Sequence, residues 1–317
     1  MELVTISDIE AAAKRVADVA VRTPLLLQTW DPRKTLWLKP ENLQPVGAFK
    51  VRGAFNAITA LDEVVRARGV IAYSSGNHAQ AVAYAAQRYG IPAVIVVPDV
   101  TPRIKVEATR AYGAEIIEVP LGEHPAKAGE LAAERGLTLV PPFDDAAVIA
   151  GQGTVGLEIA EDLPDVEVVL VPVSGGGLAA GVGTAIKARC PRARVIGVEP
   201  ALAGDAADSL RRGELVRWPQ ADRGRTIADG LRSQPSELTF THLQAVVDAM
   251  VTVSEDEIRE AVRVLARQAR LVAEPSGAVT TAAYLFHADE LPAGRTVAVV
   301  SGGNADPALF AEILAER

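Results

Sequence analysis

Lys50 is the residue in this sequence best suited to covalent chemistry. Only seven of the 32 basic residues are lysines, and Lys50 stands between Phe49 and the compact run Val51-Arg52-Gly53-Ala54. Burial in such surroundings lowers the pKa of a lysine amine and makes it a nucleophile that can form a Schiff base with an aldehyde. A surface lysine whose stem packs along Phe49 is the alternative that this segment alone leaves open.

A glycine-rich turn, Ser174-Gly175-Gly176-Gly177-Leu178, lies between an apolar strand segment and a helical one. Unhindered backbone N–H groups and the helix dipole there favour phosphate binding. The same unit has the features of a dinucleotide site, because Gly175, Gly177 and Gly181 are followed about 20 residues later by Glu199 at the end of a strand. A phosphate site is predicted, and an NAD-dependent oxidoreductase is the second interpretation.

Two further polar turns follow predicted strands. The turn of residues 74–78, SSGNH, gathers hydroxyl, amide and backbone N–H groups at a helix start, which suits an anion such as a substrate carboxylate. An ordinary N-cap would need only one of these side chains. The second turn, residues 301–304, SGGN, places a hydroxyl after a buried strand, where α/β proteins hold ligands.

Short β-rich runs alternate with Ala-rich helical stretches, which predicts an α/β fold with parallel-rich sheets flanked by helices. We expect residues 69–146 to form a small α/β domain, and residues 1–68 and 147–317 to form a large domain that contains the glycine turn. Ser7 and Glu10 have the spacing of a capping box and predict a helix through about Val21. The GQGTVG segment, residues 151–156, is interpreted as the start of a helix.

Composition restricts the partners. Acidic residues exceed basic ones by 40 to 32, so the net charge of −8 provides no positive field for nucleic acid. The one cysteine, Cys190, cannot form an internal disulfide, and the first residues lack the pattern of a secretory signal, so a cytoplasmic location is expected. No apolar run reaches the length of a membrane span, so no membrane partner is expected either.

Taken together, AFKVRGA, SSGNHAQA, SGGGL and SGGN, in this order, resemble the fold-type II pyridoxal-phosphate enzymes. This is the two-domain, tryptophan synthase β-like fold, with its cofactor between the domains. Within it, the chain is most similar to the serine/threonine dehydratase and serine racemase family. The resemblance covers nearly the whole length and includes PPFDDAAVIAGQGT, TIADG and VAEPSGA.

The resemblance implies a role for each motif around pyridoxal 5'-phosphate. Lys50 would hold the cofactor and act as the catalytic base, Phe49 would pack beside its ring, and Asn77 would hydrogen-bond its phenolic oxygen. Ser301 would face the pyridine nitrogen, and Gly230 and Glu274 would surround the cofactor. Its phosphate would be bound by Ser174, Gly175, Gly176, Gly177 and Leu178. The substrate carboxylate would be bound by Ser74, Ser75, Gly76, Asn77 and His78.

A metal site is a further expectation. Glu199, Ala203 and Asp205 follow a strand and offer two carboxylates and one backbone carbonyl, the oxygen ligands that hard divalent cations prefer. They match the metal site of the racemase-like branch position by position, so the resemblance implies Mg²⁺ or Ca²⁺. Solvated loop carboxylates are the alternative. A cation would neutralise Glu199, which weakens the dinucleotide interpretation.

The reaction implied by the resemblance is deamination, through dehydration, of L-threonine or L-serine to a 2-oxo acid and ammonia by a homodimeric lyase. Ser75 matches the second acid of racemases, so serine racemase is the alternative, with hydroxyaspartate as another candidate substrate and β-replacement third. Phe143, where a familiar racemase has asparagine, leaves the β-substituent specificity open, as does Gly47-Ala48, where the family more often has Gly-Ser. A non-catalytic pyridoxal-phosphate carrier would bind the cofactor without turnover.

Overall fold

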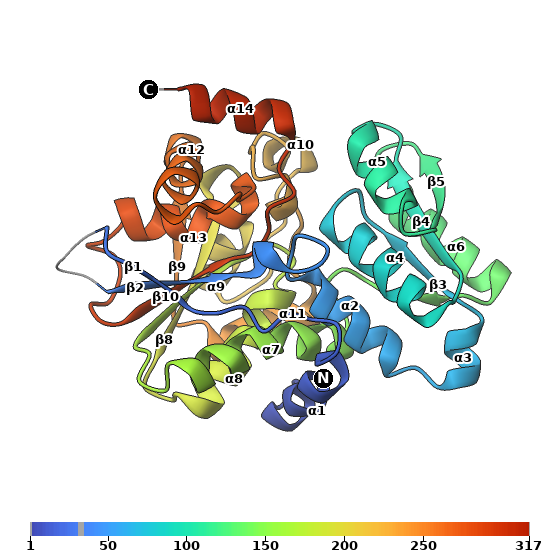
Figure 1. Ribbon diagram of the computed structural model, residues 1–317, viewed down its shortest axis with the longest axis horizontal. Helices are drawn as coiled ribbons and strands as arrows, with labels where there is room; N and C mark the ends of the chain where they lie inside the picture. Colours follow the sequence, from blue (N-terminus) through green and yellow to red (C-terminus); the bar gives the residue numbers. More distant parts are fainter. Residues whose placement is uncertain (1, 31–34, 317) are drawn as a thin grey trace.

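The structure is a computed structural model that describes residues 2–30 and 35–316. The strands of these residues form two sheets, each with helices on both faces (Figure 1). We refer to each sheet with its helices as the six-stranded part and the four-stranded part. The predicted α/β class with parallel-rich sheets is confirmed.

The six-stranded sheet has the order β1-β2-β10-β7-β8-β9, and only the edge strand β1 is antiparallel to its neighbour. Its inner strands are rich in valine, isoleucine and leucine and are buried on both faces, as expected for a parallel sheet between helix layers. The strands are β1 (Leu26–Gln28), β2 (Leu36–Pro40), β7 (Val168–Pro172), β8 (Arg194–Pro200), β9 (Ala249–Val253) and β10 (Thr296–Val300).

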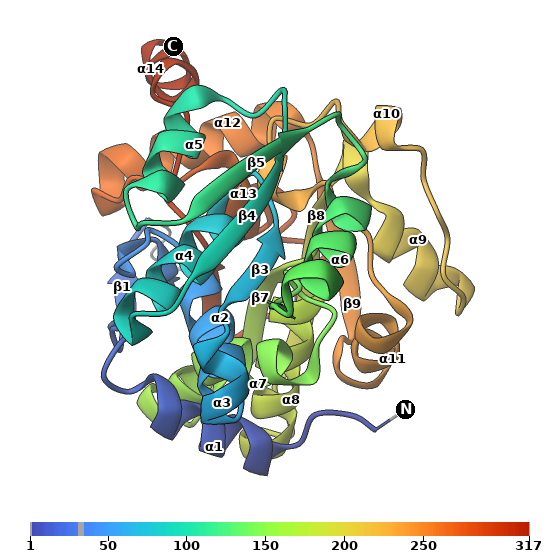
Figure 2. The same ribbon diagram turned by 90° about the vertical axis from the view of Figure 1, so that its right-hand side faces the viewer.

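The four-stranded sheet is entirely parallel and has the order β5-β4-β3-β6. Figure 2 shows its strands with α4 and α6 on opposite faces. Its elements are β3 (Val70–Tyr73), β4 (Ala93–Pro98), β5 (Glu115–Val119), β6 (Thr138–Leu139), α4 (Asn77–Tyr89), α5 (Arg103–Arg110) and α6 (His124–Arg135). Two helices lead into it, α2 (Lys50–Thr59) and α3 (Glu63–Ala67).

The other helices belong to the six-stranded part. They are α1 (Ile6–Val16), α7 (Ala146–Asp162), α8 (Gly177–Arg189), α9 (Asp205–Arg212), α10 (Gln220–Arg223), α11 (Glu237–Val246), α12 (Glu255–Val264), α13 (Pro275–Phe286) and α14 (Pro307–Ala315). Short turns are η1 (Glu41–Leu43), η2 (Ala201–Ala203), η3 (Asp229–Leu231) and the π-helical η4 (Leu265–Ala269). None of the described helices is long and apolar enough to span a membrane.

The GQGTVG segment is the interior of α7, so its interpretation as a helix start is wrong. The helix begins earlier, directly after Asp145, whose side chain accepts a hydrogen bond from Val148 N. The glycines serve close helix packing instead: a Cβ on Gly156 would lie 2.6 Å from Val182 O of α8, and one on Gly151 would lie 2.6 Å from Arg52 O of α2. Helix α7 therefore packs tightly against both α8 and α2.

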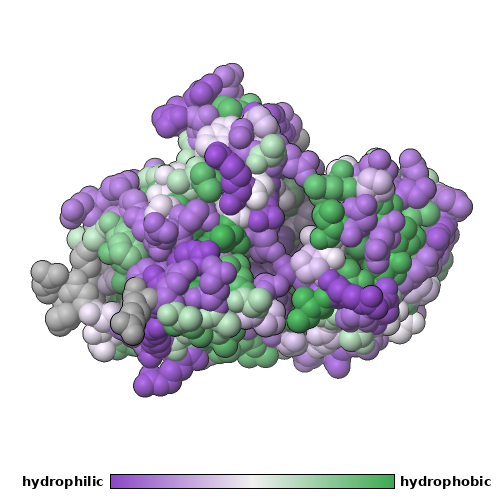
Figure 3. Space-filling model, turned by 90° about the horizontal axis from the view of Figure 1, so that it is seen from above, coloured by the Kyte–Doolittle hydropathy of each residue, from purple (hydrophilic) through white to green (hydrophobic). Residues whose placement is uncertain are grey.

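The first helix also differs from its prediction. Its capping box joins Thr5 and Asp8, not Ser7 and Glu10, and the helix ends at Val16. Val21 lies beyond the helix: its backbone N–H donates to Gln44 Oε1, 2.9 Å away, and its carbonyl accepts from Gln44 Nε2. Helix α2 lies between the two parts in Figure 1, and the surface is hollowed between them in Figure 3.

Candidate active site

Lys50 is the first residue of α2, and two contacts fix the start of this helix. Phe49 N donates to Ser301 O, 3.1 Å away, and Ala48 forms a β-bridge with Gly302. These contacts tie the lysine to the turn that follows β10. The predicted neighbours Lys50, Phe49 and Ser301, from distant parts of the sequence, therefore lie together.

The amine of Lys50 has the character expected of a nucleophile. Its Nζ donates to Pro142 O at 2.6 Å and lies 5.1 Å from the centre of the Phe49 ring. Burial lowers the pKa of Lys50 to about 8, with no carboxylate to offset this effect. In a fraction of the molecules the Lys50 amine is thus uncharged near neutral pH. Pro142 is a site residue that the sequence did not reveal, because a backbone carbonyl carries no side-chain signal.

The glycine turn lies between β7 and α8, and its neighbours leave room for no side chain. A Cβ on Gly175 would lie 2.2 Å from the Phe143 ring, and one on Gly177 would lie 3.0 Å from Phe143 Cβ. Gly176 has φ +90°, which favours glycine. The backbone N–H groups at the start of α8 therefore remain free of Cβ atoms, as a phosphate site requires.

The two residues that flank these glycines complete the predicted phosphate turn. Leu178 is buried behind the turn. The Oγ atom of Ser174 accepts a hydrogen bond from Ser233 N at 3.0 Å. This contact fixes the start of the turn against the segment that follows η3.

A polar network connects the turns of the two parts. Asn77, the first residue of α4, donates from Nδ2 to Glu274 Oε1 at 2.7 Å, and Asn304 Nδ2 donates to Asn77 Oδ1 at 2.7 Å. Glu274 is only 4% exposed, and burial, reinforced by the charge of Asp229, raises its pKa to about 7. Asn304 was not among the predicted site residues, although it belongs to the SGGN motif.

The hydroxyl of Ser276 joins the remaining predicted residues. Gly230 N donates to Ser276 Oγ at 2.9 Å, and Ser301 Oγ lies 3.5 Å from Ser276 O. Ser276 stands in the first turn of α13, directly after Glu274 and Pro275. Gly230, Glu274 and Ser301 therefore surround one helix start. Ser276 was also missed, although the VAEPSGA segment contains it.

The turn of residues 74–78 presents its groups unequally. Ser75 is exposed, whereas Ser74 Oγ accepts from Gly76 N at 3.2 Å. His78 is buried, and its Nε2 lies 2.8 Å from Val140 O. Burial, with a smaller effect from the charge of Lys50, lowers the pKa of His78 to about 3, so its ring is neutral. The imidazole thus has a packing role, and the hydroxyls and backbone N–H groups remain for an anion.

The three predicted metal ligands lie between β8 and α9. Glu199 and Asp205 are both fully buried, and Asp205 Oδ1 and Oδ2 have no hydrogen-bond partner among the described residues. The Glu199 oxygens accept from Ala206 N and Ala207 N, at 3.2 and 2.8 Å. Burial and the nearby Asp205 raise the pKa of Glu199, and burial raises the pKa of Asp205 to about 6. A buried carboxylate with two unpaired oxygens, Asp205, beside a second buried carboxylate, Glu199, fits a bound cation.

No three His, Cys, Asp or Glu side chains within residues 2–30 and 35–316 gather closely enough to hold a metal ion by themselves. A cation at Glu199 and Asp205 would therefore need backbone oxygens, and Ala203, buried in η2, lies between the two carboxylates in the chain. Both oxygens of Glu199 already accept backbone hydrogen bonds. Glu199 therefore does not have the free carboxylate that a ribose ligand requires.

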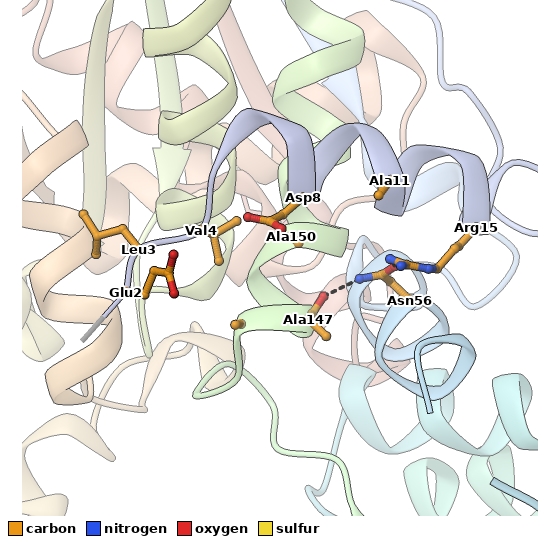
Figure 4. Close-up of a pocket in the computed structure, with 10 residues that line it drawn as sticks. Glu2, Leu3, Val4, Asp8, Ala11, Arg15, Asn56, Ala147 and Ala150 are labelled. Atoms are coloured by element: carbon orange, nitrogen blue, oxygen red, sulfur yellow. Dashed lines mark hydrogen bonds between the residues drawn. The ribbon is translucent and has the colours of Figure 1, made fainter. Parts of the chain in front are cut away.

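A separate cavity of about 370 Å³ lies between the N-terminal segment, α1, α2 and α7 (Figure 4). None of the predicted site residues lines it. Three of its polar side chains are already paired: Arg15 Nη1 donates to Asn56 Oδ1, Asn56 Nδ2 donates to Ala147 O, and Asp8 caps α1 with Thr5. The candidate active site is thus the gathering of turns around Lys50.

Comparisons with known proteins agree with this geometry. Residues 16–302 match the family described as pyridoxal-phosphate dependent enzyme, and the chain belongs to that family. It is similar to an L-threonine ammonia-lyase of Thermotoga maritima, with 46% identity over 98% of this chain and 78% of the relative. It is also similar to a serine racemase of Oryza sativa, with 39% identity over 98% of this chain and 94% of the relative.

Two solved structures show the same fold. The crystal structure of a threonine deaminase from T.th. has a TM-score of 0.89 and 44% identity over 95% of this chain and 99% of that chain. The structure of maize serine racemase has a TM-score of 0.93 and 37% identity over 98% of this chain and 97% of that chain. The resemblance and the fold-type II architecture expected from the sequence are confirmed, and the dinucleotide interpretation is replaced.

Proposed function

We propose that this protein is a pyridoxal-phosphate-dependent ammonia-lyase that converts L-threonine or L-serine to a 2-oxo acid and ammonia. The observation that carries the proposal is the amine of Lys50, with a pKa of about 8, which Pro142 O holds beside Phe49, whose backbone N–H donates to Ser301 O. The similarity to threonine ammonia-lyases supports the choice of substrate.

The residues present fit the cofactor. A Cβ at any of the three glycines of this turn would meet a neighbouring side chain, so their backbone N–H groups stay uncovered. The phosphate would therefore be bound by Gly175, Gly176 and Gly177, together with Ser174 and Leu178. Phe49 would pack beside the ring, Asn77 would donate to its phenolic oxygen, and Gly230, Glu274 and Ser301 would complete its surroundings. Pyridoxal phosphate, when bound, supplies an electron sink for the charge left on the substrate Cα.

Lys50 would remove the proton from Cα, since its uncharged amine can act as a general base. Pro142 O orients the Nζ atom through the 2.6 Å hydrogen bond. The backbone N–H groups and hydroxyls of residues 74–78 would bind the substrate carboxylate and thereby direct Cα toward the lysine. The neutral His78 ring would add no charge to that step.

Borohydride reduction of the holoenzyme, followed by peptide mapping, tests the assignment. We expect the reduced cofactor on Lys50, and we expect Lys50→Ala to abolish turnover while leaving the fold intact. Lys127→Ala is the matched control, because Lys127 is a half-buried lysine of α6 paired with Glu130. Label on another lysine would refute the assignment, and label on Lys50 without turnover would identify a non-catalytic carrier.

Serine racemase is the second candidate, favoured by the exposed position of Ser75 in the turn before α4. A second acid must reach Cα from the side opposite the lysine, and an exposed hydroxyl can do so. Chiral analysis of the products with L-serine separates the two functions. Formation of D-serine that Ser75→Ala removes, with 2-oxo acid formation retained, would establish the racemase. Hydroxyaspartate should be assayed alongside, since it is the remaining candidate substrate.

We further propose that Mg²⁺ or Ca²⁺ binds between Glu199, Ala203 and Asp205. Support comes from the unpaired oxygens of the fully buried Asp205. The remaining expectations stay predictions: a large domain of residues 1–68 and 147–317, a small domain of residues 69–146, a homodimer and a cytoplasmic location.

A further inference from the structure

A chain of polar side chains crosses from the four-stranded part to the six-stranded part. Asn77 starts α4, whereas Glu274 precedes α13 and Asn304 follows β10. Asn77 lies between the other two, with its Nδ2 2.7 Å from Glu274 Oε1 and its Oδ1 2.7 Å from Asn304 Nδ2. The orientation of the Asn77 amide therefore depends on what these two neighbours can donate and accept.

The contact between Asn304 and Val46 settles that orientation. Asn304 Nδ2 lies 2.8 Å from Val46 O, a backbone carbonyl that can only accept hydrogen bonds. The amide nitrogen of Asn304 must face this carbonyl, and its second proton is then directed at Asn77. Asn77 must consequently present its oxygen to Asn304 and its nitrogen to the opposite side, where Glu274 lies.

Glu274 could not impose this orientation alone. Its pKa of about 7 means that it is protonated in part of the molecules near neutral pH. A carboxylate only accepts a hydrogen bond, but a protonated carboxyl can also donate one. With Glu274 as its sole partner, Asn77 could point either its nitrogen or its oxygen toward the cofactor side.

The surrounding backbone is shaped around Asn304. A Cβ on Gly47 would lie 2.5 Å from Asn304 Oδ1, and Gly47 has φ +71°. Gly303 N donates to Gly47 O at 2.8 Å, which holds the two loops together. Gly47 thus provides the space that the Asn304 side chain occupies, and the side chain has little freedom to turn.

We propose that Asn304 is a positioning residue that fixes the amide of Asn77 with an N–H directed at the phenolic oxygen of pyridoxal phosphate. This inference rests on the proposed function, in which Asn77 contacts the cofactor. One N–H of Asn77 Nδ2 donates to Glu274, and the second remains for the cofactor. A donor at that place stabilises the ionised phenolic oxygen, whereas the reversed amide would favour its protonated form.

Two substitutions at residue 304 test the proposal in graded steps. Asn304→Ala removes the donor and frees the Asn77 amide to adopt either orientation. Asn304→Asp offers only acceptors and favours the reversed amide. Asn77→Asp is the reference, because its side chain cannot donate to the cofactor at all. Asn42→Asp is the matched control, since Asn42 Nδ2 also donates to a loop carbonyl, Val272 O at 3.0 Å.

The readouts are the absorption spectrum of the holoenzyme, which distinguishes the two tautomers of the lysine-bound cofactor, and the Kd of the apoprotein for pyridoxal phosphate. We expect the share of the phenol-protonated tautomer to increase from wild type through Asn304→Ala to Asn304→Asp, which should resemble Asn77→Asp. Loss of one hydrogen bond to a charged acceptor should raise the Kd about tenfold in Asn304→Asp. Asn42→Asp should keep the wild-type spectrum.

The outcomes separate the possible failures. A changed spectrum in Asn77→Asp with a wild-type spectrum in both residue-304 variants would overturn the role of Asn304 and leave the proposed function intact. A wild-type spectrum in Asn77→Asp would refute the cofactor contact of Asn77 itself. Thermal unfolding of each apoprotein controls for folding: a spectral change that appears only in a variant with an unfolded apoprotein counts against the proposal.

Discussion

Burial gives the ionisable residues around Lys50 different charge states. The ring of His78 is neutral because its pKa falls to about 3, and the pKa of Lys50 falls to about 8 for the same reason. The pKa of Glu274 rises to about 7, since burial opposes its negative charge. The site thus holds one amine that is partly uncharged at neutral pH and can accept a proton, without a nearby carboxylate to keep it protonated.

The low pKa of Lys50 predicts how the apoprotein captures its cofactor. Only the uncharged amine attacks an aldehyde, so the capture rate should rise with pH, by about tenfold per unit well below pH 8, and level off above it. Stopped-flow absorbance of apoprotein mixed with pyridoxal phosphate measures this rate. Glu274→Gln tests whether Glu274, and not Lys50, causes the pH dependence of the capture rate. We expect this variant to keep the same pH dependence. A capture rate that no longer depends on pH in Glu274→Gln would assign the titration to Glu274.

At the scale of the elements, glycines determine how closely α7 and α8 approach. A Cβ on Gly181 would lie 2.3 Å from Ile149 O and 2.5 Å from Gly153 N, both backbone atoms that cannot turn aside. We expect Gly181→Ala to lower the free energy of unfolding by about 1–3 kcal/mol through overpacking. Thermal and urea denaturation measure the change.

Gly129→Ala is the matched control for that prediction. Gly129 is also inside a helix, α6, but no heavy atom lies within 4 Å of its added Cβ. Alanine there should raise the stability by about 0.5–1 kcal/mol, because glycine weakens a helix interior. Equal effects of the two substitutions would show that helix propensity, and not the contact between α7 and α8, governs both.

The strand β8 and the helix α9 bring together Glu199 and Asp205, whose raised pKa values predict a cation effect. Because both pKa values are higher in the folded protein, it binds more protons than the unfolded chain, and stability falls as pH rises from about 4 through about 6. A divalent cation would neutralise the carboxylates. Mg²⁺ or Ca²⁺ should therefore raise the Tm more at about pH 8 than at about pH 5.

Asp205→Asn controls for the cation effect. It removes one buried charge, so it should raise the Tm in the presence of a chelator and abolish most of the increase caused by the cation. A cation-dependent increase of equal size in Asp205→Asn would place the ion elsewhere. Asp222→Asn, at a half-buried residue of α10, is the comparison for a general change of charge.

The sequence predicted the elements and motifs whose signals are local, and it missed contacts that arise only in the folded chain. The alternation of strands and helices and the glycine turn at residues 174–178 have local causes. By contrast, the glycines of residues 151–156 occur inside α7 because of Val182 and Arg52, which are distant in the chain. Pro142 and Asn304 act through a carbonyl and an amide whose partners no spacing reveals.

At the scale of the whole molecule, the two parts meet through different chemistry on different sides. Helix α2 and helix α4 share an apolar cluster that includes Val51, Phe55 and Val82. Elsewhere, Lys105 of α5 forms an ion pair with Asp229 of η3, the neighbour of Gly230. Apolar packing resists separation, whereas an ion pair at a partly exposed place is weak. We expect the α2 side to be the stronger contact between the two parts and the α5 side, next to Gly230, to be the weaker one.

Breaking the pair between Lys105 and Asp229 should therefore weaken substrate binding more than cofactor binding. We expect Lys105→Ala to raise KM about 2- to 5-fold, the effect of a pair worth about 0.4–1 kcal/mol, and to leave the Kd for pyridoxal phosphate unchanged. Lys127→Ala removes an ion pair within α6 and should change neither constant. High salt should reduce the difference between wild type and Lys105→Ala, because salt screens the pair in the wild type. An unchanged KM in Lys105→Ala at low salt would show that this ion pair does not contribute to substrate binding.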